Sequence, residues 1–227
     1  MITIENTIFL ETILKKITHT SGNLILLSVV LLFSANSTVY AAGDAVAGKE
    51  KSALCQGCHG EVGISAAPNF PHLAGQYAGY IRKQIVDFQK ELRKDDTMSG
   101  MAATITEKQD LEDIAAYFAA QKGMQGEKAA ESKSGENKSG KNVYLNGNSD
   151  TALYGCVNCH GEDGKGKSPN NSVFPVIGGQ QKDYLVKQLN DFRSGSRAND
   201  PAGMMGDIAK KMTDAEIEAV SAYLTGL

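Results

Sequence analysis

The sequence predicts an all-α protein that contains the same helical domain twice in tandem. Three observations support this fold class. Apolar residues recur at three- and four-residue steps, as they do along one face of a helix. One segment of the first half is repeated in the second half, and a short cysteine motif occurs once in each half. We find no convincing run of alternating apolar and polar residues that would indicate strands.

The composition is that of a globular protein. Hydrophobic residues make up 41% and charged residues 22% of the 227 residues, so disorder of the whole chain is not expected. The formal net charge is only -3, and Lys and Arg are interleaved with acidic residues. This pattern argues against a nucleic-acid partner, which requires a basic excess to neutralise phosphates.

The repeated unit is a helix preceded by a loop. The segment FPHLAGQYAGYIRKQIVDFQKELR (70–93) matches FPVIGGQQKDYLVKQLNDFRSGSR (174–197) at one constant offset. Gene duplication is the simplest explanation. The residues that coincide are Phe70/Phe174, Pro71/Pro175, Gly75/Gly179, Gln76/Gln180, Tyr80/Tyr184, Asp87/Asp191, Phe88/Phe192 and Arg93/Arg197.

The N-terminal segment has the pattern of an export signal. Two lysines precede the apolar run 24–33, small residues follow it, and Ala41 fits the small-residue rule for cleavage. We therefore expect 1–41 to be a signal peptide and the mature, periplasmic chain to start at Ala42. The apolar run is about ten residues long, short of the roughly 20 that span a bilayer, and an uncleaved anchor is the alternative.

A polar segment separates the two copies. Residues 125–141 are rich in Gly, Ser, Lys and Glu and contain no large apolar residue, which predicts a solvated linker. The first domain is then 42–124 and the second 142–227. Asp44 is positioned to cap a helix that runs toward the first cysteine motif.

The last helix of each half is expected to begin with a capping box. Thr106 and Gln109 form the pattern in the first half, and Thr213 and Glu216 form it in the second. In such a box the hydroxyl and the longer side chain each bond a backbone N–H at the start of the helix.

All four cysteines lie in two copies of the motif Cys-x-x-Cys-His, which is the attachment signature of c-type haem. Cysteines three positions apart lie on one face of a helical turn, so both thiols can bond to one porphyrin while the adjacent histidine points at its iron. The sequence therefore predicts two covalent haems c, attached by Cys55 and Cys58 and by Cys156 and Cys159, with His59 and His160 as axial ligands.

Three other uses of the cysteines agree less well with the sequence. A disulfide within each pair suits an exported protein, but it gives no reason for a histidine after both pairs. One zinc ion held by four thiolates would have to join pairs from separate copies of the repeat. Thioredoxin-like chemistry requires a βαβ unit, which the sequence lacks.

Methionines provide the expected second axial ligands, which close the iron and raise its potential. Met98 lies eight residues before Thr106, and Met205 lies eight residues before Thr213. This shared spacing selects Met98 and Met205, with Met101 as the alternative in the first half. Four further methionines are expected to be packing residues: Met101, Met124, Met204 and Met212.

The remaining histidines are weaker candidates. His72 follows Pro71 in the first copy, whereas Val176 stands at that position in the second. A residue that both haems required would occur in both copies, so we expect His72 to be a surface side chain. An iron ligand or a proton-linked redox switch is the alternative. His19 lies in the predicted leader and is assigned no role.

Taken together, these motifs resemble cytochrome c4, a family of dihaem class I cytochromes c. The likeness covers essentially all of 42–227 and includes the mature start AGDA. The segments that carry it are NFPHLAGQ (69–76), TMSGM (97–101), QDLEDIAAYF (109–118), FPVIGGQ (174–180) and KQLNDFRSG (187–195).

This resemblance implies two tandem class I cytochrome c domains related by a pseudo-twofold axis. It also implies that a proline carbonyl accepts the proton of each ligating histidine, Pro71 for His59 and Pro175 for His160. The implied role is that of a periplasmic monomer that carries electrons from a quinol–cytochrome c oxidoreductase toward a terminal oxidase. Whether it is free or peripherally attached to the membrane stays open.

Two competing functions share part of this pattern. A dihaem enzyme or sensor, such as a peroxidase-like protein, would need one iron with an open position, and paired methionines argue against it. A dihaem subunit of a larger oxidoreductase, such as a flavocytochrome c sulfide dehydrogenase, would have the same domains and motifs. We therefore expect an electron carrier rather than an enzyme.

Overall fold

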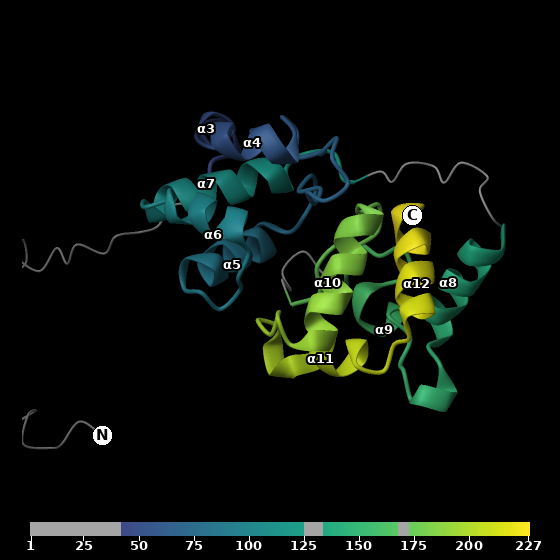
Figure 1. Ribbon diagram of the computed structural model, residues 1–227. Coiled ribbons are helices and arrows are strands. Elements are labelled where there is room, and N and C mark those ends of the chain that lie inside the picture. Colours follow the sequence, from purple (N-terminus) through teal and green to yellow (C-terminus); the bar gives the residue numbers. More distant parts are fainter. Residues whose placement is uncertain (1–41, 125–133, 168–172) are drawn as a thin grey trace, which may run out of the picture. The chain divides into compact units, whose positions relative to one another are not determined.

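The computed structural model describes residues 42–124, 134–167 and 173–227, which are helices joined by loops (Figure 1). Within these ranges the one β-type pairing is an isolated bridge between Asn148 and Leu153. The predicted signal peptide, 1–41, lies outside the described residues. Nowhere in the described ranges is a helix long and apolar enough to cross a membrane. The all-α prediction is confirmed for this part of the chain.

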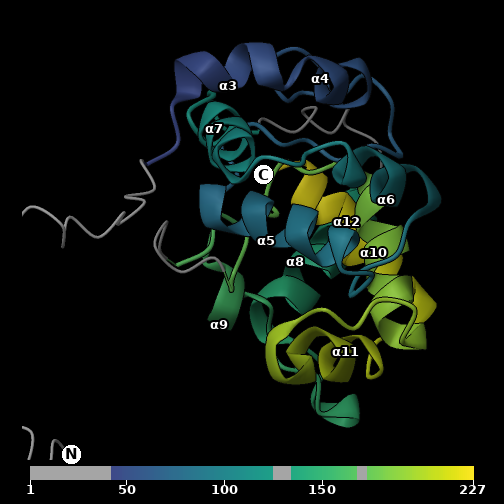
Figure 2. The ribbon, with the colours of Figure 1, turned by 90° about the vertical axis from the view of Figure 1, so that its left-hand side faces the viewer.

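In the first copy α3 (Ala45–Lys51) packs against α7 (Lys108–Ala119), and α5 (Ala78–Gln89) packs on α6 (Asp96–Ala103) and on α7. Figures 1 and 2 both show α3 lying along α7. This copy also contains α4 (Ala53–His59).

The second copy repeats this arrangement, with α8 packed against α12 and α10 packed on α11 and α12. A short 3-10 turn and a loop stand before its cysteine motif, so α9 is shorter than α4. The elements are α8 (Ser134–Asn146), η1 (Ser149–Thr151), α9 (Val157–His160), α10 (Lys182–Ser194), η2 (Pro201–Gly203), α11 (Met204–Ala209) and α12 (Asp214–Thr225).

A glycine allows the terminal helices of each copy to approach closely. A methyl group at Gly48 in α3 would lie 2.0 Å from the carbonyl oxygen of Asp113 in α7. The same substitution at Gly140 in α8 would lie 2.0 Å from the carbonyl oxygen of Ala219 in α12. Because a backbone oxygen cannot move out of the way as a side chain can, these positions require glycine.

The close contact at Gly140 corrects the predicted linker. The lack of large apolar residues predicts a linker over 125–141, but α8 begins at Ser134 and Gly140 is buried. A small residue is consistent with a solvated linker, whereas Gly140 permits close helix packing. The linker prediction was therefore too long at its C-terminal end, and its first part, 125–133, lies outside the described residues.

Each copy has its own apolar core, formed where the repeated helix meets the last helix. The first core also contains Tyr117, and Met98 packs against it. The first includes Ile81, Ile85, Phe88, Leu111, Ile114 and Phe118. The second includes Tyr144, Leu185, Met212, Ile217, Val220 and Leu224.

One of the two predicted capping boxes is present. In α12 the N–H of Glu216 donates to the Thr213 hydroxyl at 3.2 Å, and the N–H of Thr213 donates to the Glu216 carboxylate at 2.7 Å. The prediction of a capping box at Thr106 is wrong, because the N-cap residue of α7 is Glu107 and its side chain makes no capping hydrogen bond. The first copy has one more residue than the second between the buried alanine of α6 or α11 (Ala102 or Ala209) and the first core residue of the last helix (Leu111 or Ile217). This extra residue moves the helix start away from Thr106.

A buried carboxylate ties the start of α3 to α7. The Asp113 side chain is 3% exposed and accepts hydrogen bonds from the Lys51 ammonium, the Asp44 N–H at 2.8 Å and the Gln109 amide at 2.8 Å. These donors, the Lys51 ammonium first, lower the pKa of Asp113 to about 2. Asp44 also caps α3 as predicted, accepting from the N–H of Val46 at 2.8 Å.

The substitution Asp113→Asn is expected to lower the free energy of unfolding by about 1–3 kcal/mol at pH 7. Since the folded-state pKa lies below the ordinary value of 3.8, the carboxylate stabilises the fold above that value and this contribution is lost as the pH falls through 2. Guanidinium unfolding of both proteins between pH 7 and pH 2 measures it. The difference in free energy of unfolding between the two proteins should disappear near pH 2. A difference that stays constant with pH would contradict this account.

Asp110→Asn provides the matched control. Asp110 also pairs with Lys51, at 2.8 Å, but its side chain is 39% exposed, so its removal should change stability by less than about 1 kcal/mol.

Candidate functional site

The two cysteine motifs lie at equivalent positions of the two copies. Each helix ends at its histidine, after which a glycine in the left-handed region turns the chain: φ is +81° at Gly60 and +78° at Gly161. Helix α4 carries Cys55, Cys58 and His59, while Cys156 caps α9, which carries Cys159 and His160.

Both motif histidines are buried and held by a proline carbonyl. His59 is 5% and His160 7% exposed. Nδ1 of His59 lies 2.9 Å from the carbonyl oxygen of Pro71, and Nδ1 of His160 lies 3.0 Å from that of Pro175. A carbonyl can only accept, so Nδ1 must carry the proton. Burial lowers the pKa of both imidazoles, and a neutral ring with Nδ1–H has its Nε2 lone pair available for a metal.

The four cysteines are partly buried. None of the four forms a disulfide, and burial raises the pKa of Cys55 and brings that of Cys156 to about 11. Reactive redox thiolates need a lowered pKa, so the thioredoxin-like alternative is not supported. Among the described residues there is also no group of three or more His, Cys, Asp or Glu side chains that could hold a metal ion.

The motifs open into one cavity of about 840 Å³, which is lined mainly by apolar side chains. This volume lies in the upper part of the roughly 300–1,000 Å³ range of ligand pockets. The predicted site residues that line it are Cys55, His59, Pro71 and Met98 from the first copy and Cys156, Cys159, His160, Pro175 and Met205 from the second.

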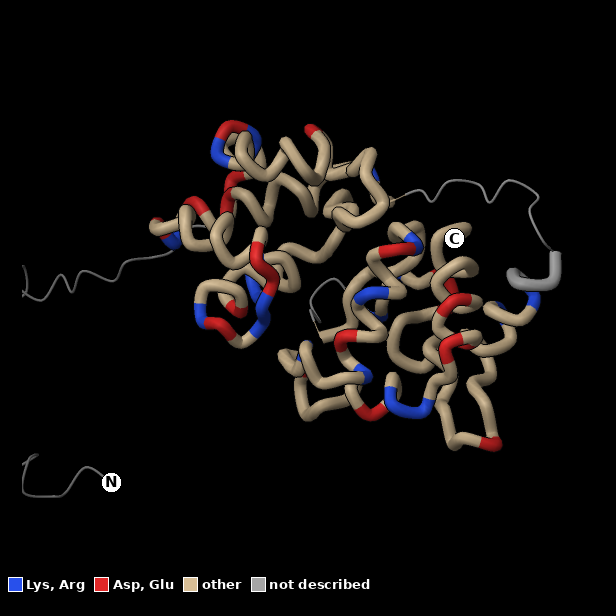
Figure 3. The backbone as a smooth tube through the Cα atoms, viewed as in Figure 1, with Lys and Arg blue, Asp and Glu red and all other residues tan. Residues whose placement is uncertain are grey.

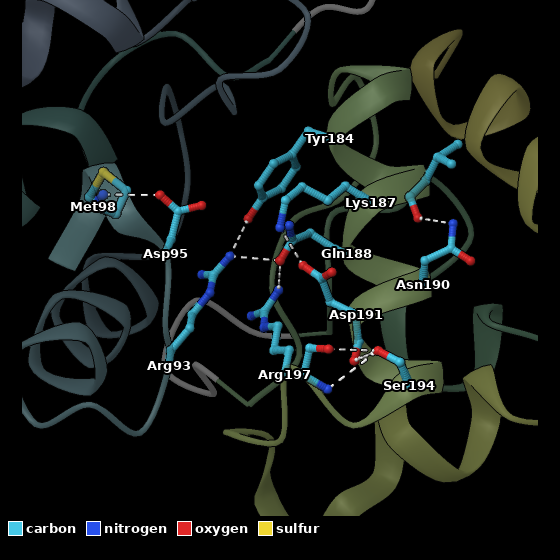
Figure 4. A network of polar contacts seen from close by, with 12 residues as sticks. Arg93, Asp95, Met98, Tyr184, Lys187, Gln188, Asn190, Asp191, Ser194 and Arg197 are labelled. Carbon is cyan, nitrogen blue, oxygen red and sulfur yellow. Dashed lines mark hydrogen bonds and ion pairs between the residues drawn. The ribbon is translucent and has the colours of Figure 1, made fainter.

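The structure places the predicted methionines at equivalent points of their helices. Met98 and Met205 each precede a fully buried alanine by four residues, Ala102 in α6 and Ala209 in α11. An aspartate accepts the backbone N–H of each, at 3.0 Å for Met98 (Figure 4) and 2.6 Å for Met205. Met101 does not line the cavity. These observations favour Met98 and Met205, whose role as ligands stays a prediction.

The other methionines differ in their surroundings. Met124 and Met212 are buried, at 6% and 5% exposure, as expected for packing residues. Met204 also lines the cavity but is 38% exposed, and it stands one residue before the position equivalent to Met98.

His72 is not the surface side chain that was predicted. It is 7% exposed, and its Nδ1 accepts a hydrogen bond from the N–H of Ser65 at 3.0 Å. Its backbone N–H and C=O both bond the side chain of Gln180 in the second copy. The prediction failed because burial here comes from contact with the other copy, which is invisible in the local sequence.

Comparisons with known proteins agree with this geometry. The family model of cytochrome c matches residues 41–122 and 138–227. Cytochrome c4 of Stutzerimonas stutzeri is 40% identical over 215 residues, which cover 90% of this chain and 99% of that protein. The chain belongs to the cytochrome c4 family. The prediction of two tandem cytochrome c domains is thereby confirmed, and two covalently bound haems c follow from the matched domains and their cysteine motifs.

A solved structure and a second relative extend the comparison. The crystal structure of reduced recombinant cytochrome c4 from Pseudomonas stutzeri has a TM-score of 0.75 and 41% identity, covering 82% of this chain and 100% of that chain. A protein named thiosulfate dehydrogenase electron acceptor, from Stutzerimonas stutzeri strain A1501, is 34% identical over 204 residues, covering 89% of this chain and 91% of that protein.

The contacts between the two cytochrome domains are reciprocal, as a pseudo-twofold axis requires. Two buried arginines lie at their centre, Arg93 at 8% and Arg197 at 6% exposure. Figure 4 shows the guanidinium of Arg93 reaching Tyr184 and Gln188 of the other domain, with Arg197 also in contact with Gln188. Arg93 donates to Gln84 and, across the interface, to Tyr184 and Gln188, and Arg197 donates to Gln188 and, across the interface, to Tyr80 and Gln84.

These arginines also fit the cofactor. Every acceptor named above is neutral, and in the part of the chain that the structure describes no carboxylate lies within ion-pair distance of either guanidinium. Both arginines line the cavity. A buried cation is costly unless it is paired, so the site suits a ligand that brings its own carboxylates, as haem does with its propionates.

The sequence patterns assign no role to these arginines or to Gln76 and Gln180. They were visible as identical positions of the repeat, Arg93/Arg197 and Gln76/Gln180. The signal that could have found them is a large polar residue that recurs in both copies beside apolar positions of the same helix or loop, which suggests burial with a fixed partner.

Proposed function

We propose that this chain is a periplasmic electron carrier that receives electrons from a membrane quinol–cytochrome c oxidoreductase and passes them toward a terminal oxidase. The observation that carries the proposal is the donor set of each domain. Each copy contributes cysteine, histidine and methionine side chains to the lining of one cavity: Cys55, His59 and Met98 from the first copy, and Cys156, Cys159, His160 and Met205 from the second. An imidazole and a thioether together close a haem iron and raise its potential, which suits transfer rather than substrate binding.

The chain's own residues have separate tasks in this function. Cys55 and Cys58 in the first domain, like Cys156 and Cys159 in the second, retain the cofactor outside the cell membrane. His59 with Met98, and His160 with Met205, would hold the iron of each haem and exclude water from it. The proline carbonyls keep each imidazole in one orientation. When bound, each haem supplies the iron that takes up and releases one electron.

The distribution of charge suits a protein partner better than a polyanion. Basic and acidic residues are interspersed over both domains within the described ranges (Figure 3), and the net charge is -3. Complementary patches of either sign can orient such a molecule on a redox partner, whereas polyanion binding needs a continuous basic surface.

The purified, fully reduced protein is expected to keep its optical spectrum when carbon monoxide is added, because this ligand enters only an open or weakly closed iron position. Spectra recorded before and after exposure test the closed donor set. A shift in half of the haem would place an open site in one domain and favour an enzyme or a sensor.

A second candidate function is that of electron acceptor for a sulfur-oxidising enzyme. It refines the sequence-based alternative of a dihaem subunit in a larger oxidoreductase such as a flavocytochrome c sulfide dehydrogenase. Its support is the 34% identity to a relative named thiosulfate dehydrogenase electron acceptor. Both candidates require the same domains and ligands, so they are distinguished by the protein that donates electrons to this chain.

Rapid mixing of the oxidised protein with each reduced donor distinguishes the candidates. Faster reduction by a quinol–cytochrome c oxidoreductase than by a thiosulfate dehydrogenase would support the first proposal. The reverse order would support the second. Gel filtration beside either donor shows whether the chain forms a permanent complex.

A further inference from the structure

A chain of hydrogen bonds joins a glutamine of the second domain to the motif histidine of the first. Nδ1 of His59 donates to the carbonyl oxygen of Pro71 at 2.9 Å. The N–H of the same peptide unit belongs to His72, and it donates to Oε1 of Gln180 at 2.7 Å. Nε2 of Gln180 returns a hydrogen bond to the carbonyl oxygen of His72 at 3.0 Å. One side chain of the second domain therefore holds the peptide unit that orients His59.

The reverse chain runs from the first domain to the second. Nδ1 of His160 donates to the carbonyl oxygen of Pro175 at 3.0 Å, and the N–H of Val176 donates to Oε1 of Gln76 at 3.0 Å. Nε2 of Gln76 donates to the carbonyl oxygen of Val176 at 2.8 Å. The arrangement does not depend on the side chain after the proline, since histidine and valine are held in the same way.

The two ends of a peptide unit are electronically linked. Resonance joins the nitrogen lone pair to the carbonyl, so an N–H that donates makes its own carbonyl oxygen a better acceptor. Such cooperative strengthening is on the order of 10–30% per bond in condensed phases. Burial keeps water from competing, because Gln76 is 5%, Gln180 4% and His72 7% exposed.

We propose that Gln76 and Gln180 are positioning residues that act across the domain interface, each tuning the haem of the opposite domain. Gln180 polarises the Pro71–His72 peptide and so strengthens its hold on the His59 imidazole. Gln76 does the same for His160 through the Pro175–Val176 peptide. A stronger bond at Nδ1 makes the imidazole a better electron donor to iron, which favours the oxidised state and lowers the potential.

The inference rests on the proposed roles of His59 and His160 as axial ligands. It adds that the interface between the domains is part of each redox site. Docking of the domains and the potential of each haem are therefore linked. Loss of either glutamine changes the potential of the haem in the other domain.

The test compares Gln180→Leu, Gln76→Leu and the parent holoprotein. NMR of the reduced, ¹⁵N-labelled protein reports the Nδ1–H of His59 and of His160 separately, and spectroelectrochemistry reports the two potentials. We expect Gln180→Leu to move the His59 proton upfield and one haem to a more positive potential, with His160 unchanged. Gln76→Leu should move the His160 proton and the potential of the other haem. The proposal is overturned if the Nδ1–H signal that shifts belongs to the histidine of the mutated domain, or if neither signal shifts.

Two further variants separate polarisation from general loosening of the interface. Gln180→Glu keeps an acceptor at Oε1 whether or not it is protonated, so the His59 proton should not move upfield. Tyr77→Phe removes another bond between the domains, from the Tyr77 hydroxyl to the carbonyl of Lys165, and should leave both protons in place. Upfield movement in either variant would contradict a role for the Oε1 acceptor.

Failure of this inference can be told apart from failure of the proposed function. Carbon monoxide binding to the parent protein would contradict the closed axial sets, yet the two Nδ1–H signals would still show which glutamine acts on which histidine. Conversely, a parent protein that excludes carbon monoxide but shows no crossed effect retains its electron-transfer role and loses only the cross-domain tuning.

Discussion

Replacing Met98 by alanine is expected to open the first haem while the second stays closed. Loss of the thioether leaves one axial side of the iron to water or an added ligand. The potential of that haem should fall by a few tenths of a volt, within the span of about 0.8 V that axial ligands control. Carbon monoxide should then bind to half of the haem in the reduced protein, and a redox titration should resolve two well-separated waves.

Three companion variants test the choice among the methionines. Met101→Ala should leave both haems closed, because Met101 does not line the cavity, whereas Met205→Ala should open the other haem. Carbon monoxide binding by Met101→Ala together with a closed Met98→Ala protein would show that Met101 is the first ligand. If Met204→Ala opens the second haem and Met205→Ala does not, Met204 is the methionine ligand of that haem.

Replacing Gly140 by alanine is expected to destabilise the second domain by about 3 kcal/mol, at the upper end of the usual range for overpacking. The added methyl group would meet the carbonyl oxygen of Ala219 at 2.0 Å and its carbon at 2.6 Å. Helices α8 and α12 would have to separate, which loosens the core they share. Guanidinium unfolding followed by far-ultraviolet circular dichroism measures the loss.

Gly57→Ala is the control for this prediction. Gly57 lies in α4, is exposed, and an added methyl group would meet nothing within 4 Å. Alanine should therefore leave stability unchanged or raise it by up to about 1 kcal/mol through its helix propensity. Equal destabilisation by both substitutions would mean that close helix contact is not the cause.

The sequence was most informative where chemistry depends on neighbours along the chain. The Cys-x-x-Cys-His spacing predicted the haems, and the Thr213 and Glu216 box is present because a capping box needs only one turn of helix. At Thr106 the same pattern failed. An extra residue before the core positions of α7 shifted the helix start, and tertiary packing overrode the local signal.

The contacts between the domains could not be predicted from the local pattern. Gln180 bonds His72 across a separation of 108 residues, and Gln76 bonds Val176 across 100. Nothing near His72 distinguishes burial by a second domain from exposure, so it was assigned to the surface. The repeat did show that Gln76 and Gln180 are equivalent, but equivalence alone does not reveal that each one serves the other copy.

The reciprocal glutamine contacts are those that two identical one-domain chains would make in a symmetric dimer. In such a dimer the residue after the proline would have to be the same on both sides. Covalent fusion removes that restriction, and this chain has histidine at 72 and valine at 176. Joining the halves into one gene thus lets two like centres diverge in their surroundings, so that one can become the preferred entry for an electron and the other its exit.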